Sequence, residues 1–394
     1  MAVLITHPVH YSSALFRRVA EEPDIALTVF FESDISLRRH ADPGFSADVE
    51  WDVPLVGGFE HTVLPALGAG RGPSFWWPFA YGLRRRLKEG QFDWLWVHGY
   101  NRPSHWLAMA AARSLGIRVM IRDDATGISR PRGRLKRLVK PLYFAALNRV
   151  AERFLAVGSL NAAYFRALGI PDEKIVLTPW AVDNAFFRVG DGTRREALRR
   201  EFGIPADAPV ILFVARLQRL KLPDLVLEAF QHLAPGAASR SPHLIFVGTG
   251  EMLPHLKEAA RGLDRVHFAG FRGQRELRGF YDLCDVFVLP SMYETWGLVV
   301  NEAMNLGKPV VVSDQVGSGH DLIRQGENGY RFPTGDAPAL AAALSDILAD
   351  PERARRMGQL SRDIISGWDF DADVRGLRTA LGLPLRTGGE KAAA

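Results

Sequence analysis

The chain has 394 residues, and 47% of them are hydrophobic, which is enough to fill more than one core. Two domains of about 190 residues each are therefore expected. The formal net charge is +5, and the single cysteine, Cys284, cannot form an internal disulfide. With no leader-like start and no apolar run long enough to cross a bilayer, these features exclude a disulfide scaffold and predict a cytoplasmic protein, soluble or peripheral to a membrane.

Strand-length apolar runs alternate with helical patterns, which is typical of doubly wound parallel sheets in an α/β protein. In the first half the expected strands are residues 2–7, 26–31, 93–99, 117–123 and 153–158. Polar residues follow several of these strands, at the edge where parallel sheets bind ligands. As candidates for contacting a ligand we take four of them: His10, Tyr11, Asp123 and Asp124.

A break at residues 178–187 marks a linker between the two halves. In the second half the expected strands are residues 210–217, 243–250, 266–271, 286–290 and 308–314. The predicted domains are therefore 1–185 and 186–367. Residues 368–394 are expected to form a helix that packs back toward the first domain, followed by a disordered tail at 387–394.

Two carboxylates, Glu294 and Glu302, lie eight positions apart in the most informative segment, residues 289–323. Glu294 follows the strand at 286–290, and a helical pattern begins at Gly297. Glu302 is then expected about a turn and a half into that helix, facing the same crevice. The unpaired N–H groups at the start of the helix would suit a phosphate.

This segment resembles the E-x7-E signature of retaining GT-B glycosyltransferases of the glycosyl transferases group 1 family (glycosyltransferase family 4). Two glutamates at this spacing would otherwise indicate a solvated helix face, but the flanking residues fall where the family places them: Pro290, Ser291, Gly297, Gly307 and Pro309. The resemblance implies two Rossmann-like domains that face each other across a cleft. The second domain would bind a nucleotide-sugar donor, and the first would bind the acceptor.

Residues 213–230 also resemble the family, in a segment where an arginine and a lysine follow a strand. Arg216 and Lys221 would hold the donor diphosphate and neutralise the charge on the leaving group. The alternative is two ordinary surface cations. The family usually has glycine after the lysine, whereas Leu222 stands here, which leaves the shape of the loop open.

The resemblance implies further donor contacts. The turn at Gly248 would line the donor pocket, although its two glycines alone are a weak signal, and the backbone of Phe271 and Arg272 would bind the base, for which uracil is favoured. Glu294 would bind sugar hydroxyls and Glu302 the ribose, while Gly297 and Leu298 would present backbone amides. His98 is expected either beside the transferred sugar or in a structural role.

No metal and no other cofactor is expected. His7 and His10 are separated by Pro8, and no carboxylate joins them. The sequence DFDAD at 369–373 contains the Asp-x-Asp spelling of metal-dependent transferases, but it precedes a helix, so helix capping explains it better.

Basic residues alternate with apolar and aromatic ones in residues 130–153 and 76–88. Such segments suit an anionic membrane surface or a lipid diphosphate acceptor, and equally an ordinary amphipathic helix. Nucleic-acid binding is a poorer interpretation, because no recognised module accompanies the charge.

These features together predict a retaining, metal-independent transferase that moves a hexose-type sugar from a UDP-sugar to an acceptor hydroxyl. The expected setting is the synthesis of cell-surface polysaccharide or lipid-linked oligosaccharide. The alternatives are a natural-product glycosyltransferase of the same fold, a sugar-nucleotide epimerase or phosphorylase of the same architecture, and a non-catalytic partner that binds sugar nucleotides.

Overall fold

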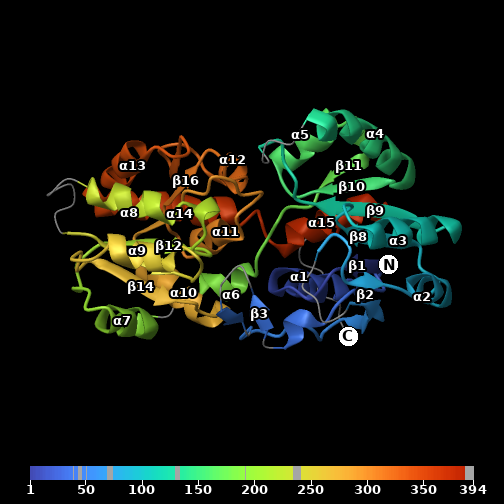
Figure 1. The fold of residues 1–394 in the computed structure, drawn as a ribbon, viewed down its shortest axis with the longest axis horizontal. Coiled ribbons are helices and arrows are strands. Elements are labelled where there is room, and N and C mark those ends of the chain that lie inside the picture. Colours follow the sequence, from blue (N-terminus) through green and yellow to red (C-terminus); the bar gives the residue numbers. More distant parts are fainter. Residues whose placement is uncertain are drawn as a thin grey trace. The chain divides into compact units, whose positions relative to one another are not determined.

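The computed structural model describes residues 1–38, 40–42, 47–49, 51–68, 74–128, 134–190, 192–233 and 241–386. The expected disordered tail at 387–394 lies outside the described residues, as do residues 130–133 of the basic segment. The chain forms two compact units (Figure 1). Unit 1 comprises Met1–His40, Val53–Ala181 and Asp369–Ala394, and unit 2 comprises Ala41–Asp52 and Val182–Trp368.

Unit 1 is built on a seven-stranded sheet of order β11-β10-β9-β8-β1-β2-β5, in which every neighbouring pair is parallel. Its strands are β1 Ala2–Ile5, β2 Thr28–Phe31, β5 Glu60–Val63, β8 Trp94–His98, β9 Arg118–Asp123, β10 Arg153–Ala156 and β11 Ile175–Leu177. A short hairpin, β6 Ala66–Leu67 with β7 Phe79–Ala80, lies between β5 and β8 in the chain.

Helices cover both faces of this sheet. Leu15, Phe16 and Val19 of α1 (His10–Ala20) share one core with Val374 and Leu377 of α15 (Phe370–Leu381). The opposite core is formed with residues of α2 Leu83–Glu89, α3 Pro103–Ser114, α4 Arg134–Val150 and α5 Ser159–Ala167. Because both faces are covered, the central strands are buried, which explains their nearly continuous apolar sequences.

Unit 2 contains a six-stranded parallel sheet of order β14-β13-β12-β15-β16-β17. Its strands are β12 Val210–Val214, β13 His243–Val247, β14 Val266–Gly270, β15 Val286–Leu289, β16 Val310–Ser313 and β17 Gly329–Phe332. Its helices are α6 Asn184–Arg188, α7 Gly192–Glu201, α8 Pro223–Gln231, α9 Leu253–Ala259, α10 Gln274–Leu283, α11 Leu298–Asn305, α12 Ser318–Leu322, α13 Ala337–Ala349 and α14 Pro351–Ile365. The short strands β3 His40–Asp42 and β4 Ala47–Val49 form a separate sheet.

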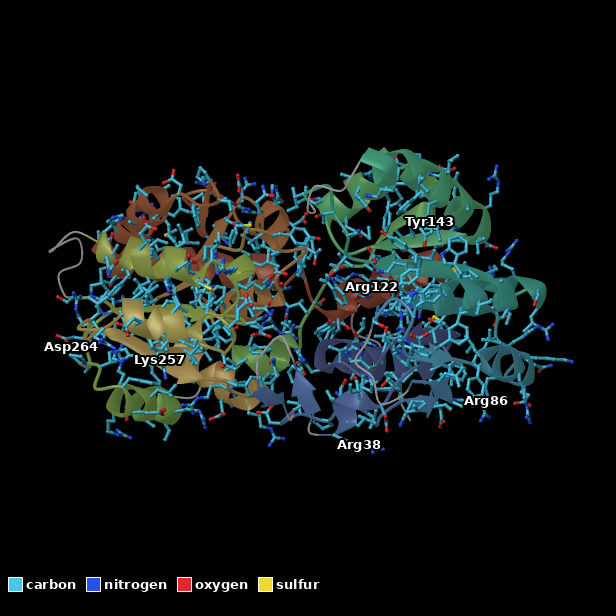
Figure 2. The ribbon with its side chains drawn as sticks, in the orientation of Figure 1. Arg38, Arg86, Arg122, Tyr143, Lys257 and Asp264 are labelled. Carbon is cyan, nitrogen blue, oxygen red and sulfur yellow. The ribbon has the colours of Figure 1, made fainter. Side chains whose placement is uncertain are left out.

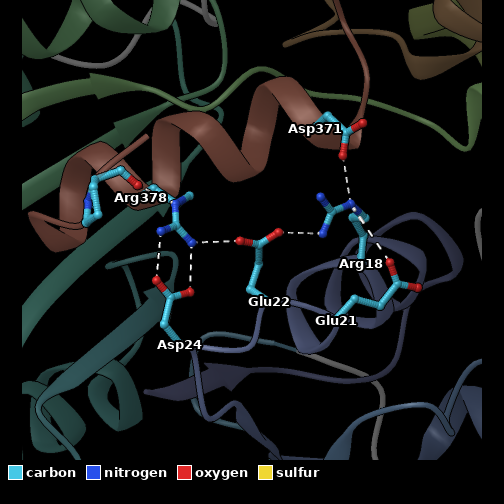
Figure 3. Close-up of polar contacts among 7 residues, drawn as sticks. Arg18, Glu21, Glu22, Asp24, Asp371 and Arg378 are labelled. Atoms are coloured by element: carbon cyan, nitrogen blue, oxygen red, sulfur yellow. Dashed lines mark hydrogen bonds and ion pairs between the residues drawn. The ribbon is translucent and has the colours of Figure 1, made fainter. Parts of the chain in front are cut away.

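The last helix, α15, is held within unit 1 by ion pairs (Figure 3). Arg378 donates to Glu22 at 2.7 Å and to Asp24 at 2.7 Å. Arg18 of α1 bridges Glu22 at 2.8 Å and Asp371 at 2.7 Å. The carboxyl-terminal helix is therefore an integral part of the unit that begins the chain.

A second contact of α15 is fully buried. Arg122 of β9, labelled in Figure 2, donates to Asp373 at 2.7 Å, and both side chains are 1% exposed. The same guanidinium donates to the carbonyl of Thr178 at 3.0 Å and stacks over the Trp180 ring at 4.4 Å. Asp369 caps α15 by accepting from the Ala372 amide at 2.8 Å, which confirms that the DFDAD segment belongs to a helix start.

The prediction of a doubly wound α/β fold is confirmed. Each of the ten expected strands is present, as are three edge strands that the sequence did not suggest, β5, β11 and β17. Polar or charged residues interrupt the apolar pattern in β5 and β17, and β11, which is Ile-Val-Leu, has only three residues. In β5, for example, the residues are Glu-His-Thr-Val, and only Thr62 is not exposed.

Candidate functional site

Each sheet has one point at which the strand order reverses. In unit 2 the chain proceeds from β12 outward to β13 and β14, and from β15 in the other direction to β16 and β17. In unit 1 it proceeds from β1 to β2 and β5, and from β8 to β9, β10 and β11. Doubly wound sheets bind ligands beyond the carboxyl ends of the two strands at this reversal. The residues after β12 and β15, and after β1 and β8, therefore define the candidate sites.

In unit 2 these loops bring a lysine and a glutamate together. Lys221 ends the short helix Arg219–Lys221 that follows β12, and its ammonium forms an ion pair with Glu294, which follows β15. The loops are also joined through their backbones, since the amide of Met292 donates to the carbonyl of Leu220 at 2.9 Å. The Lys221 and Glu294 side chains are 21% and 18% exposed, so both are accessible to a ligand.

The loop keeps a left-handed turn directly after Lys221. Leu222 has φ 48° and ψ 49°, a conformation in which glycine is favoured over residues with a Cβ. This geometry explains why glycine is usual here in the family that the sequence resembles. The substitution has therefore not abolished the turn, and Leu222 packs its side chain against the core of unit 2. Arg216, two residues beyond β12, is exposed at the same sheet edge.

Glu294 is fixed by its own backbone. Its amide donates to the carbonyl of Gln315 at 3.0 Å, and its carbonyl accepts from Gly317 at 3.0 Å. Gly297, at φ 92°, precedes the first residue of α11, Leu298. A Cβ on Gly297 would lie 3.0 Å from Leu289 Cδ2 and 3.2 Å from Glu294 Cγ, so it would crowd both side chains as well as strain the left-handed backbone.

Glu302 lies on α11 as the helical pattern suggested, but its carboxylate is buried and only 3% exposed. The Tyr281 hydroxyl of α10 donates to Glu302 Oε2 at 2.7 Å. Burial raises the pKa of Glu302 to about 7, while hydrogen bonds from Tyr281 and Gln274 act in the opposite direction. Burial and the neighbouring carboxylate raise the pKa of Tyr281 well above its usual value. This carboxyl group therefore changes its charge near neutral pH.

The remaining donor candidates lie at the same carboxyl edge. Gly248 follows β13 with φ 130°, and a Cβ there would lie 2.0 Å from the carbonyl oxygen of Ala215. Phe271 and Arg272 follow β14 directly. The Arg272 side chain forms ion pairs with Glu201 at 2.9 Å and Glu276 at 3.2 Å, so its guanidinium has a structural role and only its backbone remains a candidate for binding a base.

Sequence reasoning missed the residues that position Glu302. Tyr281 and Gln274 both belong to α10, whose first amides are capped by Asp52 from a distant part of the chain. The Asp52 carboxylate accepts from the amides of Gln274 at 2.9 Å and Arg275 at 3.0 Å. Nothing in the sequence around Asp52 suggests this, because the contact spans 222 positions.

In unit 1 the candidates lie on both sides of the strand reversal. His98 ends β8, stacks on Trp96 at 4.7 Å and packs edge-on against Phe16 at 5.9 Å. Burial, with the nearby charges of Arg122 and His105, holds the pKa of His98 well below 6.5, so the ring is neutral at physiological pH.

The weaker candidates of unit 1 lie on neighbouring loops. His10 and Tyr11 begin α1 and pack edge-on at 5.1 Å, and burial lowers the pKa of His10 to about 4. Asp123 ends β9, and its carboxylate accepts from the amide of Ala125 at 2.8 Å, which fixes the turn that contains Asp124. Neutral imidazoles, an aromatic ring and two carboxylates thus lie beyond the carboxyl ends of β1, β8 and β9.

Two features of the described residues bear on metals and membranes. Among them, no group of three or more His, Cys, Asp and Glu side chains is arranged to hold a metal ion. Likewise, no helix in the described part of the chain has the length and apolar character needed to span a bilayer.

Comparison with known proteins matches both halves of the chain to glycosyltransferase families. The family described as "Glycosyl transferases group 1" matches residues 194–363, and "Glycosyltransferase Family 4" matches residues 33–186. The first match contains Arg216, Lys221, Glu294 and Glu302, and the second contains His98.

Among curated relatives, the chain is 34% identical over 218 residues to a D-inositol 3-phosphate glycosyltransferase from Thermomonospora curvata, covering 52% of this chain and 50% of the relative. It is 31% identical over 197 residues to the alpha-D-kanosaminyltransferase of Streptomyces kanamyceticus, covering 49% of this chain and 50% of the relative. The chain thus spans about half the length of the curated relatives that it matches.

Solved structures share the fold over nearly the whole chain. HepE from Anabaena, crystallised with UDP, superimposes with a TM-score of 0.73 and 17% identity, covering 97% of this chain and 100% of HepE. WaaG, a glycosyltransferase involved in lipopolysaccharide biosynthesis, gives a TM-score of 0.65 and 16% identity, covering 98% of this chain and 100% of WaaG. At this level of identity the likeness shows the GT-B fold.

Proposed function

Because this chain belongs to the glycosyl transferases group 1 family (glycosyltransferase family 4), we propose that it transfers a hexose-type sugar from a nucleotide diphosphate sugar to an acceptor hydroxyl, with retention of configuration. The observation that carries the proposal is the Lys221–Glu294 ion pair at the strand reversal of unit 2. This pair supports the proposal because a lysine ammonium can bind phosphate and the adjacent carboxylate can accept hydrogen bonds from sugar hydroxyls.

In this proposal the donor diphosphate competes with Glu294 for Lys221. An oxygen of the diphosphate takes the ammonium, and the released carboxylate accepts hydrogen bonds from the sugar. Arg216, exposed at the same edge, adds a planar guanidinium that can hold two phosphate oxygens. Both cations would stabilise the negative charge that develops on the leaving diphosphate, so the site residues can perform the reaction without a metal ion.

The rest of the donor is assigned to the neighbouring loops. The backbone at Phe271 and Arg272 would bind the base, Gly248 would line the pocket, and Glu302 would bind the ribose. The amides of Gly297 and Leu298 would face the phosphates. We propose a UDP-sugar as the donor. The support is the shared fold with HepE, whose structures include complexes with UDP and with UDP-glucose.

The acceptor is proposed to bind unit 1, beside the neutral ring of His98. A neutral imidazole can accept a hydrogen bond from a sugar hydroxyl without placing a second positive charge near the reacting carbon. His10, Tyr11, Asp123 and Asp124 are the further acceptor candidates. The proposed setting is the synthesis of cell-surface polysaccharide or lipid-linked oligosaccharide at the inner face of a membrane.

The experiment that tests this function is a thermal-shift screen against UDP, GDP, ADP and dTDP, with and without EDTA. A ligand that binds only the folded state raises its melting temperature. We expect stabilisation by UDP that survives EDTA and is lost in Lys221→Met. Sugar transfer is then tested with UDP-hexoses and glycan acceptors. Stabilisation without turnover would favour the alternative of a non-catalytic sugar-nucleotide partner, and no stabilisation by any nucleotide would overturn the proposed donor site.

A further inference from the structure

Exposed large apolar side chains and exposed cations lie close together along the chain of unit 1. Four apolar residues lie within fifteen positions of one another and are more than half exposed: Leu67 at 58%, Phe75 at 56%, Trp76 at 61% and Tyr81 at 53%. The cations follow directly on α2: Arg84, Arg85, Arg86 and Lys88. We refer to these eight residues as the aromatic-basic surface. Apolar residues of this size rarely gather on a solvated surface unless they bind something.

The apolar side chains are held outward by a fixed turn. The amide of Ser74 donates to the carbonyl of Trp77 at 2.7 Å, and the Trp77 ring packs where a Cβ on Gly68 would lie 2.6 Å from it. Trp77 is therefore turned toward the protein while Phe75 and Trp76 point away, with their rings edge-on at 4.9 Å.

Buried contacts anchor this turn to the sheet. The Arg102 guanidinium, which forms a buried ion pair with Glu32 at 2.5 Å, also donates to the carbonyl of Pro78 at 2.7 Å. The amide of Tyr81 donates to the carbonyl of Pro65 at 2.9 Å. The aromatic side chains are thus presented by a rigid support, so little conformational entropy is lost when they bind.

Helix α2 separates its apolar and charged residues. Leu83 and Leu87 are buried in the core of unit 1, whereas all four of its cations are exposed. Its only acid, Glu89, forms an ion pair with Arg85 at 2.6 Å. Within the described part of the chain, no ion pair engages Arg84, Arg86 or Lys88. Figure 2 shows the side chain of Arg86 extending outward from α2.

We propose that the aromatic-basic surface docks on an anionic lipid bilayer. Tryptophan and tyrosine favour the boundary between headgroups and acyl chains, where the ring is apolar and the polar tip remains hydrated. Neighbouring arginine and lysine side chains are attracted to anionic headgroups. A protein partner fits less well, because an exposed cluster of cations would require a matching acidic surface on that partner.

The test is co-sedimentation of the full chain with vesicles of phosphatidylcholine alone or with 30% phosphatidylglycerol, at low salt. We expect binding to the anionic vesicles only, and loss of that binding in 1 M salt. The triple variant Arg84→Gln, Arg86→Gln, Lys88→Gln should bind on the order of 100-fold more weakly. The double variant Phe75→Ser, Trp76→Ser should also bind at least 10-fold more weakly.

Control variants remove the same charge, or two exposed apolar side chains, elsewhere. Arg261→Gln, Arg355→Gln, Arg356→Gln replaces three exposed arginines, and Val189→Ser, Leu385→Ser replaces two exposed apolar residues. Both should bind as the unmodified chain does, and melting temperatures should show that every variant is folded. Equal binding to neutral vesicles, no binding to anionic ones, or unchanged binding by either test variant would overturn the proposal. Stabilisation by UDP is measured separately, so a negative result with vesicles does not contradict the proposed donor site.

Discussion

Tyr281 and Glu302 form a buried hydrogen bond of 2.7 Å that joins α10 to α11. Glu302 is the residue proposed to bind the ribose. Its position depends on α10, a helix that does not otherwise belong to the candidate site. That helix is capped by Asp52, and Gln274 at its start forms a second hydrogen bond with Glu302. The candidate donor site is thus positioned by Tyr281, Gln274 and Asp52, which are not themselves assigned to the ligand.

The buried Glu302 predicts a pH-dependent stability. Its pKa is raised by burial from 4.5 to about 7, so the folded state favours the protonated form. Protonation of Glu302 therefore contributes fully to the free energy of unfolding below pH 4.5. This contribution, about 3 kcal/mol, is lost as the pH rises to about 7. Glutamine does not ionise, so Glu302→Gln does not lose this stability as the pH rises. The melting temperature of the variant minus that of the unmodified chain should therefore be larger at pH 8 than at pH 5. Thermal denaturation at both pH values checks this, and an equal difference at both would contradict it.

The Tyr281 hydroxyl is predicted to tune donor binding. Its hydrogen bond lowers the pKa of Glu302, so Tyr281→Phe should raise that pKa further. The ionised carboxylate is the better acceptor for ribose hydroxyls. The donor KM should therefore fall as the pH rises through about 7, and in Tyr281→Phe this fall should move to higher pH while kcat changes little.

A suitable control for Tyr281→Phe is Tyr164→Phe. Tyr164 is also buried, but within the described residues its hydroxyl has no hydrogen-bond partner. The control should leave the pH profile of the donor KM unchanged. Identical profiles for the two variants would show that the Tyr281 hydroxyl does not act through Glu302.

Loss of the two cations proposed to bind the diphosphate should lower turnover strongly. If each stabilises developing charge by a few kcal/mol, the double variant Arg216→Ala, Lys221→Ala should reduce kcat by several orders of magnitude. Arg219→Ala is the control, because Arg219 is an exposed cation in the same short helix as Lys221. Steady-state transfer kinetics provide the measurement. Near-normal turnover of the double variant would refute the assignment.

The glycine before α11 should be required for the geometry of Glu294. Gly297→Ala combines a left-handed backbone at φ 92° with close contacts to Leu289 and Glu294. Gly335→Ala is a matched control, since Gly335 has φ 86° and a Cβ there would meet nothing within 4 Å. Both should lose about 1–2 kcal/mol from backbone strain. Gly297→Ala alone should lose stability beyond this amount, as measured by denaturation. It alone should also lose donor binding, as measured by the thermal shift with UDP.

The buried Arg122–Asp373 pair should be essential for the stability of unit 1. Arg122→Met leaves the Asp373 carboxylate without its cation, at a cost of about 3–5 kcal/mol. The double variant Arg122→Met, Asp373→Leu should recover part of this loss, because neither charge is then buried alone. Arg113→Met, which removes an exposed ion pair with Glu152, should cost less than about 1 kcal/mol. Urea denaturation of the four chains gives the comparison.

The sequence was informative where a residue's role depends on its neighbours along the chain. The central strands are buried on both faces, so each appears as an apolar run, whereas the edge strands β5 and β17 contain polar residues and β11 is only three residues long. Lys221 and Glu294 lie in local motifs that resemble the family. Tyr281 and Asp52 could not be found this way, because their contacts with Glu302 and α10 cross 21 and 222 positions.

The position of α15 has a consequence for how the protein is made. A ribosome synthesises the other residues of unit 1 long before α15, yet Val374 and Leu377 of this helix belong to the core of unit 1, and its Asp373 is the partner of Arg122. Unit 1 therefore cannot reach its final packing until α15 has been synthesised. Unit 2, whose residues end at Trp368, has its full sequence earlier. The unit that begins the chain is thus completed after unit 2, unlike the usual case in which the first domain is complete, and can fold, first.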